Sequence, residues 1–191
     1  MWAEDGNVEV DIRTRTDKVL SVFQWLQPIW KCGEISKEIK LRLYSSIVVP
    51  IATYACETLK TTVKATKMVD VLHRRCLRRI PGISWRDHIT NDEVMTLSGQ
   101  TVLHNIVAMR RRRFIGRILR LPLTRLASLA IERRPEDGKR NIGRPKRTWQ
   151  DRLKENLEVM GIDWSDKTTA ASDRANWRRT VDECSAQSWT N

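Results

Sequence analysis

Apolar residues recur at intervals of three and four along most of this 191-residue chain. This spacing places them on one face of an α-helix. One such face holds Ile12, Val19, Phe23, Leu26 and Trp30. No segment shows the alternation of apolar and polar residues that is typical of a half-buried strand. We therefore predict an all-α fold.

Prolines and capping residues divide the first half of the pattern into three helices. Pro28 lies late in the first helix and is expected to kink or end it. Ser36 is expected to cap a second helix, in which Pro50 should introduce a bend. A third helix is predicted over residues 62–80, where Pro81-Gly82 follows. The second helix has a predicted apolar face made of Ile39, Leu43, Ile47, Ile51 and Tyr54.

The second half of the chain has similar signals. Thr90 and Glu93 form the pattern of a capping box for a short helix that should close at Gly99. A long helix is then predicted over residues 102–121, followed by shorter helices over 123–132, 149–160 and 170–184. Residues predicted to be largely buried are Trp30, Tyr54, Leu72, Phe114, Ile118, Trp149 and Leu153.

The positive charge is concentrated in one segment. Residues 110–147 contain fourteen Lys or Arg and three Asp or Glu, so they carry +11 of the net charge of +12. A solvated helix face is the ordinary explanation of a charge run, but this concentration favours a polyanion such as nucleic acid. In the predicted helix over 102–121, the arginines expected on the faces away from the core are Arg110, Arg112, Arg113, Arg117 and Arg120.

A second basic cluster lies in the helix predicted over residues 62–80. Its members are Arg74, Arg75, Arg78 and Arg79. Like charges at i and i+4 destabilise a helix unless an anion or an acidic side chain relieves them. Asp70, together with water, is the internal alternative to a bound phosphate.

The stretch KRNIGRPKRTW, residues 139–149, resembles a minor-groove hook because it contains Gly-Arg-Pro among basic residues. Ile142 occupies the position where such a hook has an upstream arginine. We therefore favour a linker that contacts phosphates through Arg144, Lys146 and Arg147, and a solvated connector is the remaining alternative. Trp149 has the helical spacing of a core residue, although base stacking is a second possibility.

The sequence offers little for catalysis or metal binding. Among its adjacent acidic pairs, Asp92-Glu93 is explained by a helix cap and Glu136-Asp137 lies in a turn. None lies on the apolar strand that a polymerase site would use, so the paired carboxylates of a two-metal nuclease or polymerase are missing. His73 and Cys76, with His88 or His104, give a weak zinc pattern, and an ordinary core cysteine is the better explanation. We expect no cofactor and no metal. The four cysteines lack C-x-x-C spacing, no secretory leader or membrane span is recognisable, and we expect a nuclear or cytoplasmic protein.

Four segments occur in an order that resembles the C-terminal third of non-LTR (LINE-type) retrotransposon reverse transcriptases. They are LRLYSSIVVPIATYACETL, LHRRCLRRIPGISWRDHITNDEV, MRRRRFIGRILRL and GRPKRTWQDRLKENL. The resemblance extends from about Gly6 to the segment around Trp177. The chain departs from the family pattern at Leu59, Arg117 and Ile142.

The resemblance implies a reverse-transcriptase thumb, a helical packet that grips the primer–template duplex, over residues 1–85. It also implies a helical connector with an arginine-rich helix over 86–132, and a basic linker with C-terminal helices over 133–191. In this family the catalytic aspartates lie upstream, so we expect no enzyme activity from this chain alone. Tyr54-Ala55-Cys56-Glu57 only superficially resembles the catalytic motif.

The leading hypothesis is thus a reverse-transcriptase fragment that binds RNA, DNA or their hybrid, largely through phosphates. The alternatives are a helical DNA-binding or architectural module with a minor-groove arm, and a non-functional remnant of a retroelement. The predicted nucleic-acid contacts are Arg74, Arg75, Arg78, Arg79, Arg110, Arg112, Arg113, Arg117, Arg144, Lys146 and Arg147.

Overall fold

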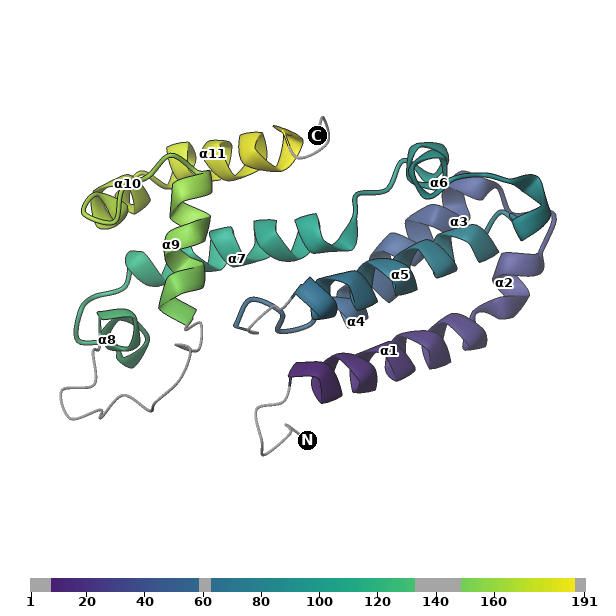
Figure 1. Ribbon diagram of the computed structural model, residues 1–191, viewed down its shortest axis with the longest axis horizontal. Coiled ribbons are helices and arrows are strands. Elements are labelled where there is room, and N and C mark those ends of the chain that lie inside the picture. The colour runs from purple at the N-terminus through teal and green to yellow at the C-terminus, as the bar shows by residue number, and fades with distance from the viewer. Residues whose placement is uncertain (1–7, 59–62, 133–148, 188–191) are drawn as a thin grey trace. The chain divides into compact units, whose positions relative to one another are not determined.

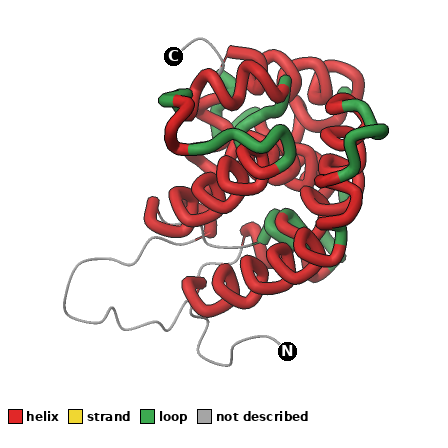
Figure 2. Tube along the Cα trace, turned by 90° about the vertical axis from the view of Figure 1, so that its right-hand side faces the viewer, coloured by secondary structure: helices red, strands yellow, loops and turns green. Residues whose placement is uncertain are grey.

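The computed structural model describes residues 8–58, 63–132 and 149–187 (Figure 1). Within these ranges the regular elements are helices joined by loops, and Figure 2 shows no strand among them. The predicted all-α fold is confirmed. The chain divides into two compact units, Met1–Val107 (unit 1) and Ala108–Asn191 (unit 2). Among the described helices, none has the length and apolar character needed to cross a bilayer.

The helices follow the predicted order. Unit 1 contains α1 (Val8–Trp25), α2 (Gln27–Lys31), α3 (Lys37–Leu43), α4 (Val49–Ala52), α5 (Val63–Arg79) and α6 (Asn91–Ser98). The helix α7 (Leu103–Leu119) starts in unit 1 and ends in unit 2. Unit 2 continues with α8 (Leu126–Glu132), α9 (Trp149–Val159), α10 (Lys167–Ser172) and α11 (Arg174–Gln187). The functional division expected at residues 85 and 132 stays a prediction.

The core of unit 1 is organised around Trp30. Pro28 lies in the first turn of α2, so α1 ends before it, as predicted. The Trp30 ring stacks on Phe23 with centroids 5.2 Å apart, and its Nε1–H donates to the Phe23 carbonyl at 2.9 Å. The buried Lys40 ammonium donates to the Trp30 carbonyl at 3.0 Å. Trp30 therefore joins α1, α2 and α3 in one packing unit.

The predicted inward face of the second helix is displaced by about one position. Ser36 caps α3 as expected, but Ile39 and Tyr54 are exposed, at 52% and 72%. The buried positions are instead Leu41, Tyr44 and Val48. The sequence pattern did not reveal this buried face because it includes a charged residue, Lys40. The Lys40 ammonium group is buried and donates a hydrogen bond to the Trp30 carbonyl. The prediction that Tyr54 is buried was wrong.

A π-helical turn over Tyr44–Val48 precedes Pro50 in this helix. There the Val49 N–H bonds to the Tyr44 carbonyl, five residues back. Because a proline ring clashes with the carbonyl four residues earlier in a regular helix, the wider turn accommodates Pro50. Helix α4 ends at Ala52, so Tyr54 lies in the turn that follows, where it is exposed.

The caps of α5 and α6 are those predicted. Gly82 has a φ of +77°, and the Ile83 N–H bonds to the Arg78 carbonyl at 2.9 Å, which closes α5. Thr90 and Glu93 form the reciprocal capping box, with bonds of 2.6 and 3.3 Å. Gly99, with a φ of +59°, ends α6.

Unit 2 has its own core. Its buried members are Ile115, Ile118, Ile131, Leu153, Leu157, Met160, Ala171, Trp177 and Val181. Leu72 in unit 1, and Ile118 and Leu153 here, are buried as predicted, whereas Phe114 is half-buried and packs on the edge of this cluster. The side chain of Trp149 lies outside the described residues.

The last predicted helix is two helices, α10 and α11, divided at Asp173. The Asp173 carboxylate accepts from the backbone N–H groups of Ala175 and Asn176 at 3.0 and 2.9 Å. It therefore caps the start of α11, a signal that the apolar periodicity did not reveal.

Replacing Asp173 with alanine is expected to lower the free energy of unfolding by about 1 kcal/mol, because it removes this cap. Asp166→Ala is the matched control, since Asp166 precedes α10 without a side-chain capping bond. Thermal unfolding followed by circular dichroism should show a clear decrease in Tm for Asp173→Ala only. Equal decreases for the two variants would contradict the capping role.

Candidate nucleic-acid interface

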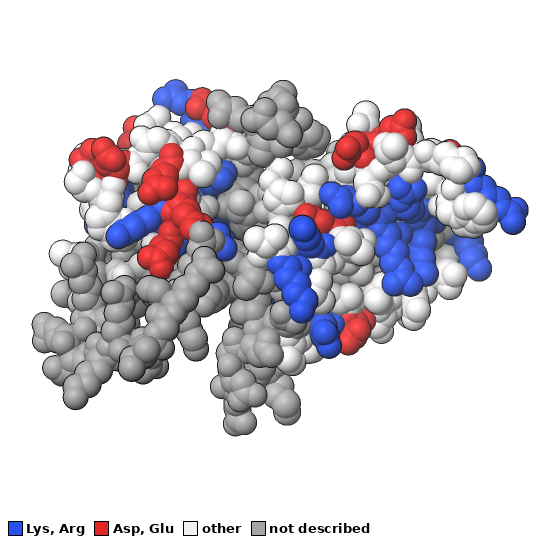
Figure 3. All heavy atoms as spheres, viewed as in Figure 1, with Lys and Arg blue, Asp and Glu red and all other residues white. Residues whose placement is uncertain are grey.

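Helix α5 carries the densest positive charge in unit 1. It contains Lys64, Lys67 and four arginines, against one acidic residue, Asp70. Figure 3 shows basic side chains gathered on the unit 1 part of the face in view, with few acidic ones among them. Asp70 is therefore the residue of α5 that could neutralise part of this charge.

Asp70 does not relieve the arginine repulsion, because it is turned inward. It is 6% exposed, and its carboxylate accepts from the His104 backbone N–H at 3.2 Å and contacts His104 Nδ1 at 2.7 Å. The carboxylate thereby fastens the first turn of α7 to α5. Among the described residues, no carboxylate pairs with Lys67, Arg75 or Arg79 of α5, so these three cations face water or an external anion.

The four predicted arginines of α5 differ in their surroundings. Arg75 and Arg79 are exposed, whereas Arg74 is half-buried and its Nε has no hydrogen-bond partner. Arg78 donates through Nη2 to the Ile89 carbonyl at 2.8 Å and to Asn91 Oδ1 at 3.1 Å. Arg78 thus braces the loop before α6, and Arg75 and Arg79 are the two best placed to meet a ligand.

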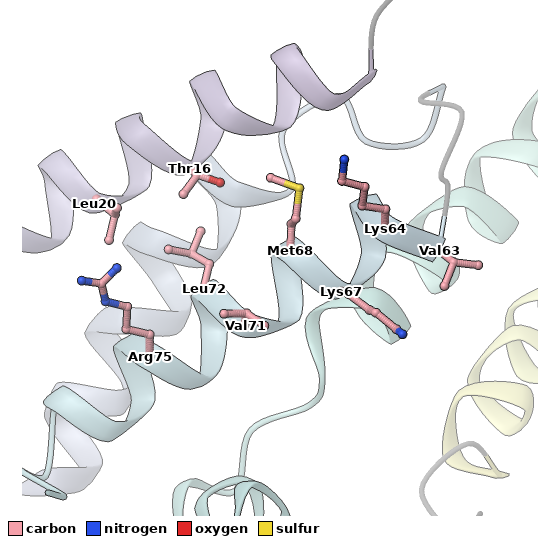
Figure 4. A pocket seen from close by; sticks show the side chains of 9 residues that line it. All are labelled: Thr16, Leu20, Val63, Lys64, Lys67, Met68, Val71, Leu72 and Arg75. Atoms are coloured by element: carbon pink, nitrogen blue, oxygen red, sulfur yellow. The ribbon is translucent and has the colours of Figure 1, made fainter. Parts of the chain in front are cut away.

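Lys67, Val71, Arg75 and Arg79 are exposed and follow one another at i+4 spacing, a row that we call the α5 stripe. At 1.5 Å per residue it extends for about 18 Å. Beside it lies a groove of about 700 Å³ between α1 and α5 (Figure 4). The groove is lined by Thr16, Leu20, Val63, Lys64, Lys67, Met68, Val71, Leu72 and Arg75. The described residues of this lining include no aromatic ring for base stacking, so the stripe suits phosphates better than bases.

The arginines of α7 correct one prediction. Arg112, expected on an outer face, is 9% exposed, its Nε has no partner, and burial lowers its pKa. Arg113 is exposed but pairs with Asp182 at 2.7 Å. Arg117 is exposed and Arg110 is half-buried. Of these four, Arg117 is the most available to an external anion.

Trp177 packs against the backbone of α7 beside Arg112. Its indole lies across α7, and its Nε1–H donates to the Arg112 carbonyl at 3.0 Å. Gly116 allows this approach, because a Cβ at that position would overlap the indole. The one glycine in the arginine-rich helix therefore marks the place where α11 packs.

Arg144, Lys146 and Arg147 lie outside the described residues, so their predicted phosphate contacts stay a prediction.

His73 and Cys76 belong to the core. His73 is fully buried; its Nδ1 lies 2.8 Å from the Tyr44 hydroxyl and its Nε2 lies 3.1 Å from the Thr101 carbonyl. Because a carbonyl only accepts, Nε2 carries the proton and Nδ1 accepts from Tyr44. Burial raises the pKa of the Cys76 thiol to about 11. Both imidazole nitrogens are thus engaged, and no metal-binding group of three is present in the described chain.

Several exposed residues were missed from the sequence. Lys64 and Lys67 extend the basic surface of α5, and Arg174 and Arg178 form an i, i+4 pair at the start of α11. Trp85 is 79% exposed on a short helical turn, Trp85–Asp87, that Ser84 and Asp87 cap reciprocally. The like-charge spacing that drew attention to Arg74 and Arg78 would also have identified Arg174 and Arg178.

Comparison with known proteins supports one relationship. Over 151 residues the chain is 28% identical to a protein of Caenorhabditis elegans described as a putative uncharacterized transposon-derived protein. The match covers 74% of this chain and 53% of the relative, so the chain spans about half the length of that curated relative. No family model and no solved structure matches the chain.

Proposed function

We propose that this chain is a C-terminal part of a retrotransposon reverse transcriptase, which holds template–primer by its basic helices. The observation that carries the proposal is the α5 stripe: within the described residues its cations form no ion pair, and Asp70, the acid of α5, is bound to His104 instead. The relative described as transposon-derived supports the same origin. The four segments that resemble LINE-type enzymes supply the finer assignment.

Binding through the stripe should follow the physics of phosphate contacts. Arginine gives charge-assisted hydrogen bonds to phosphate oxygens, and each neutralised phosphate releases counterions. Affinity should therefore fall steeply with salt and depend little on base sequence. The described residues that line the adjacent groove include no aromatic ring, which favours this mode over base recognition.

Changing Arg75 and Arg79 together to glutamine is the direct test. Each lost phosphate contact removes about 0.9 from the slope of log K against log salt on B-DNA, so the slope should flatten by about 1.8. Arg13→Gln with Lys31→Gln, two exposed cations on α1 and α2, is a control with the same change in charge. Fluorescence anisotropy with a mixed-sequence DNA duplex at several salt concentrations gives the slopes.

Equal slopes for these two double variants would contradict a role for the stripe. Loss of binding confined to A·T-rich duplexes on substitution of Arg144 would favour the alternative, an architectural module with a minor-groove arm.

The proposed fragment catalyses nothing by itself. In the resembling enzymes two metal ions are held by aspartates upstream of the segment represented here. Primer extension on an RNA template with Mg²⁺ or Mn²⁺ should give no product above the background without protein. Incorporation that is lost on substitution of a carboxylate of this chain would overturn this part of the proposal.

A further inference from the structure

Four arginines lie together where the end of α7 meets the start of α11. They are Arg117 in the last turn of α7, Arg120 directly after that helix, and Arg174 and Arg178 on α11. All four are exposed. We refer to them as the arginine cluster of unit 2.

The crossing of α7 and α11 fixes this arrangement. Trp177 bonds to the Arg112 carbonyl, Arg113 pairs with Asp182, and Arg120 Nη1 donates to the Ala171 carbonyl at 2.9 Å. Arg113, Gly116 and Arg120 contact Asp182, Trp177 and Ala171 in turn, so partner numbers fall as α7 numbers rise and the two helices run antiparallel. The buried indole of Trp177 beside Gly116 then holds the cluster in place.

The charges are balanced at one end of this helix pair and unbalanced at the other. Asp182 forms an ion pair with Arg113, and Glu183 forms a longer one, of 3.9 Å, with Arg179. Within the described residues, no carboxylate pairs with Arg117, Arg174 or Arg178. Burial and then the charges of Arg174, Arg178 and Arg117 lower the pKa of Arg120.

The four positive charges destabilise this part of unit 2 unless an anion binds among them. Like charges at i and i+4 destabilise a helix, and a cation at a helix N-terminus, such as Arg174, opposes the helix dipole. An anion placed among the four guanidinium groups would reverse the sign of both effects. Guanidinium forks match the geometry of phosphate oxygens, so a phosphodiester is the anion that suits this cluster.

We propose that the arginine cluster binds backbone phosphates of nucleic acid, as a second contact besides the α5 stripe. This inference rests on the proposed function, because it takes nucleic acid as the ligand. It assigns a role to Arg174 and Arg178, and leaves Arg112 and Arg113 as structural residues of unit 2.

Neighbouring arginines of α11 provide the test. Arg178→Gln removes a member of the cluster, while Arg179→Gln removes the same charge from the next residue, whose ion pair with Glu183 is exposed. The salt dependence of binding to a short mixed-sequence DNA duplex is measured for the full chain and both variants. Arg178→Gln should flatten the slope by about 0.9, and Arg174→Gln with Arg178→Gln by about 1.8, whereas Arg179→Gln should leave it unchanged.

The outcomes separate the two proposals. If the unchanged chain does not bind the duplex, the proposed function itself fails. If it binds and Arg75→Gln with Arg79→Gln flattens the slope, but Arg178→Gln matches Arg179→Gln, only the arginine cluster is refuted. Circular dichroism should show unchanged helicity for Arg178→Gln, because the substitution removes repulsion and no buried contact.

Discussion

Replacing Trp177 with alanine is expected to lower the free energy of unfolding of unit 2 by about 3–5 kcal/mol. The indole is 2% exposed and fills the space between α7 and α11. Its removal deletes a large buried side chain, leaves a cavity and removes the hydrogen bond to the Arg112 carbonyl. Chemical denaturation followed by circular dichroism measures the loss. Trp85→Ala, at a position 79% exposed, is the control and should change stability by less than about 0.5 kcal/mol.

Gly116 provides a second test of the packing of Trp177 against α7. Gly116→Ala should cost about 1–3 kcal/mol while Trp177 is present, because the new methyl group overlaps the indole. In the Trp177→Ala background the cost should disappear, since alanine is a better helix former than glycine. Additive effects in this double-mutant cycle would show that the two residues do not pack together.

Local signals predicted the helices well because they depend on neighbours in the chain. Ser36, the Thr90–Glu93 capping box and the glycines at 82 and 99 have the roles read from the sequence. These features need only a few adjacent backbone groups. No tertiary contact has to be known to place them.

Side-chain environments were less predictable where tertiary contacts decide them. Arg112 has the period of a surface residue, yet it is buried in unit 2, where Trp177, 65 positions away, bonds to its carbonyl. Asp70 was the internal alternative to a bound anion beside its neighbouring arginines, but its carboxylate contacts His104, 34 residues away. Periodicity alone cannot show which cations a fold uses internally and which remain for a ligand.

Acidification should destabilise unit 1 through His73. Burial is the main cause that lowers the pKa of this imidazole from 6.5 to about 4, although Asp70 acts in the opposite direction. Its Nδ1 accepts from Tyr44 and its Nε2 donates to Thr101, so the folded state holds the neutral ring. Protonation would place an extra proton on Nδ1, where the structure supplies a donor.

The sign follows from proton uptake. Between pH 6.5 and pH 4 the unfolded chain binds a proton at His73 that the folded chain does not bind. The free energy of unfolding therefore falls as the pH is lowered through this window, and the full contribution is present above pH 6.5. From pH 7 to pH 5 the loss from this residue should be about 2 kcal/mol.

His73→Gln isolates this effect, because an amide can donate to the Thr101 carbonyl and accept from Tyr44 without titrating. The difference in unfolding free energy between the original protein and His73→Gln should shrink or reverse in favour of glutamine by about 2 kcal/mol from pH 7 to pH 5. His88 and His104 are common to both proteins, so their contributions cancel. Glu93 does not interfere in this pH range. The hydrogen bond from the Thr90 backbone lowers its pKa, so its contribution to stability changes only below about pH 4.5. A difference in unfolding free energy that does not change with pH would contradict this account. It would mean that His73 takes up a proton in the folded state as readily as in the unfolded state, despite its hydrogen bonds to Tyr44 and Thr101.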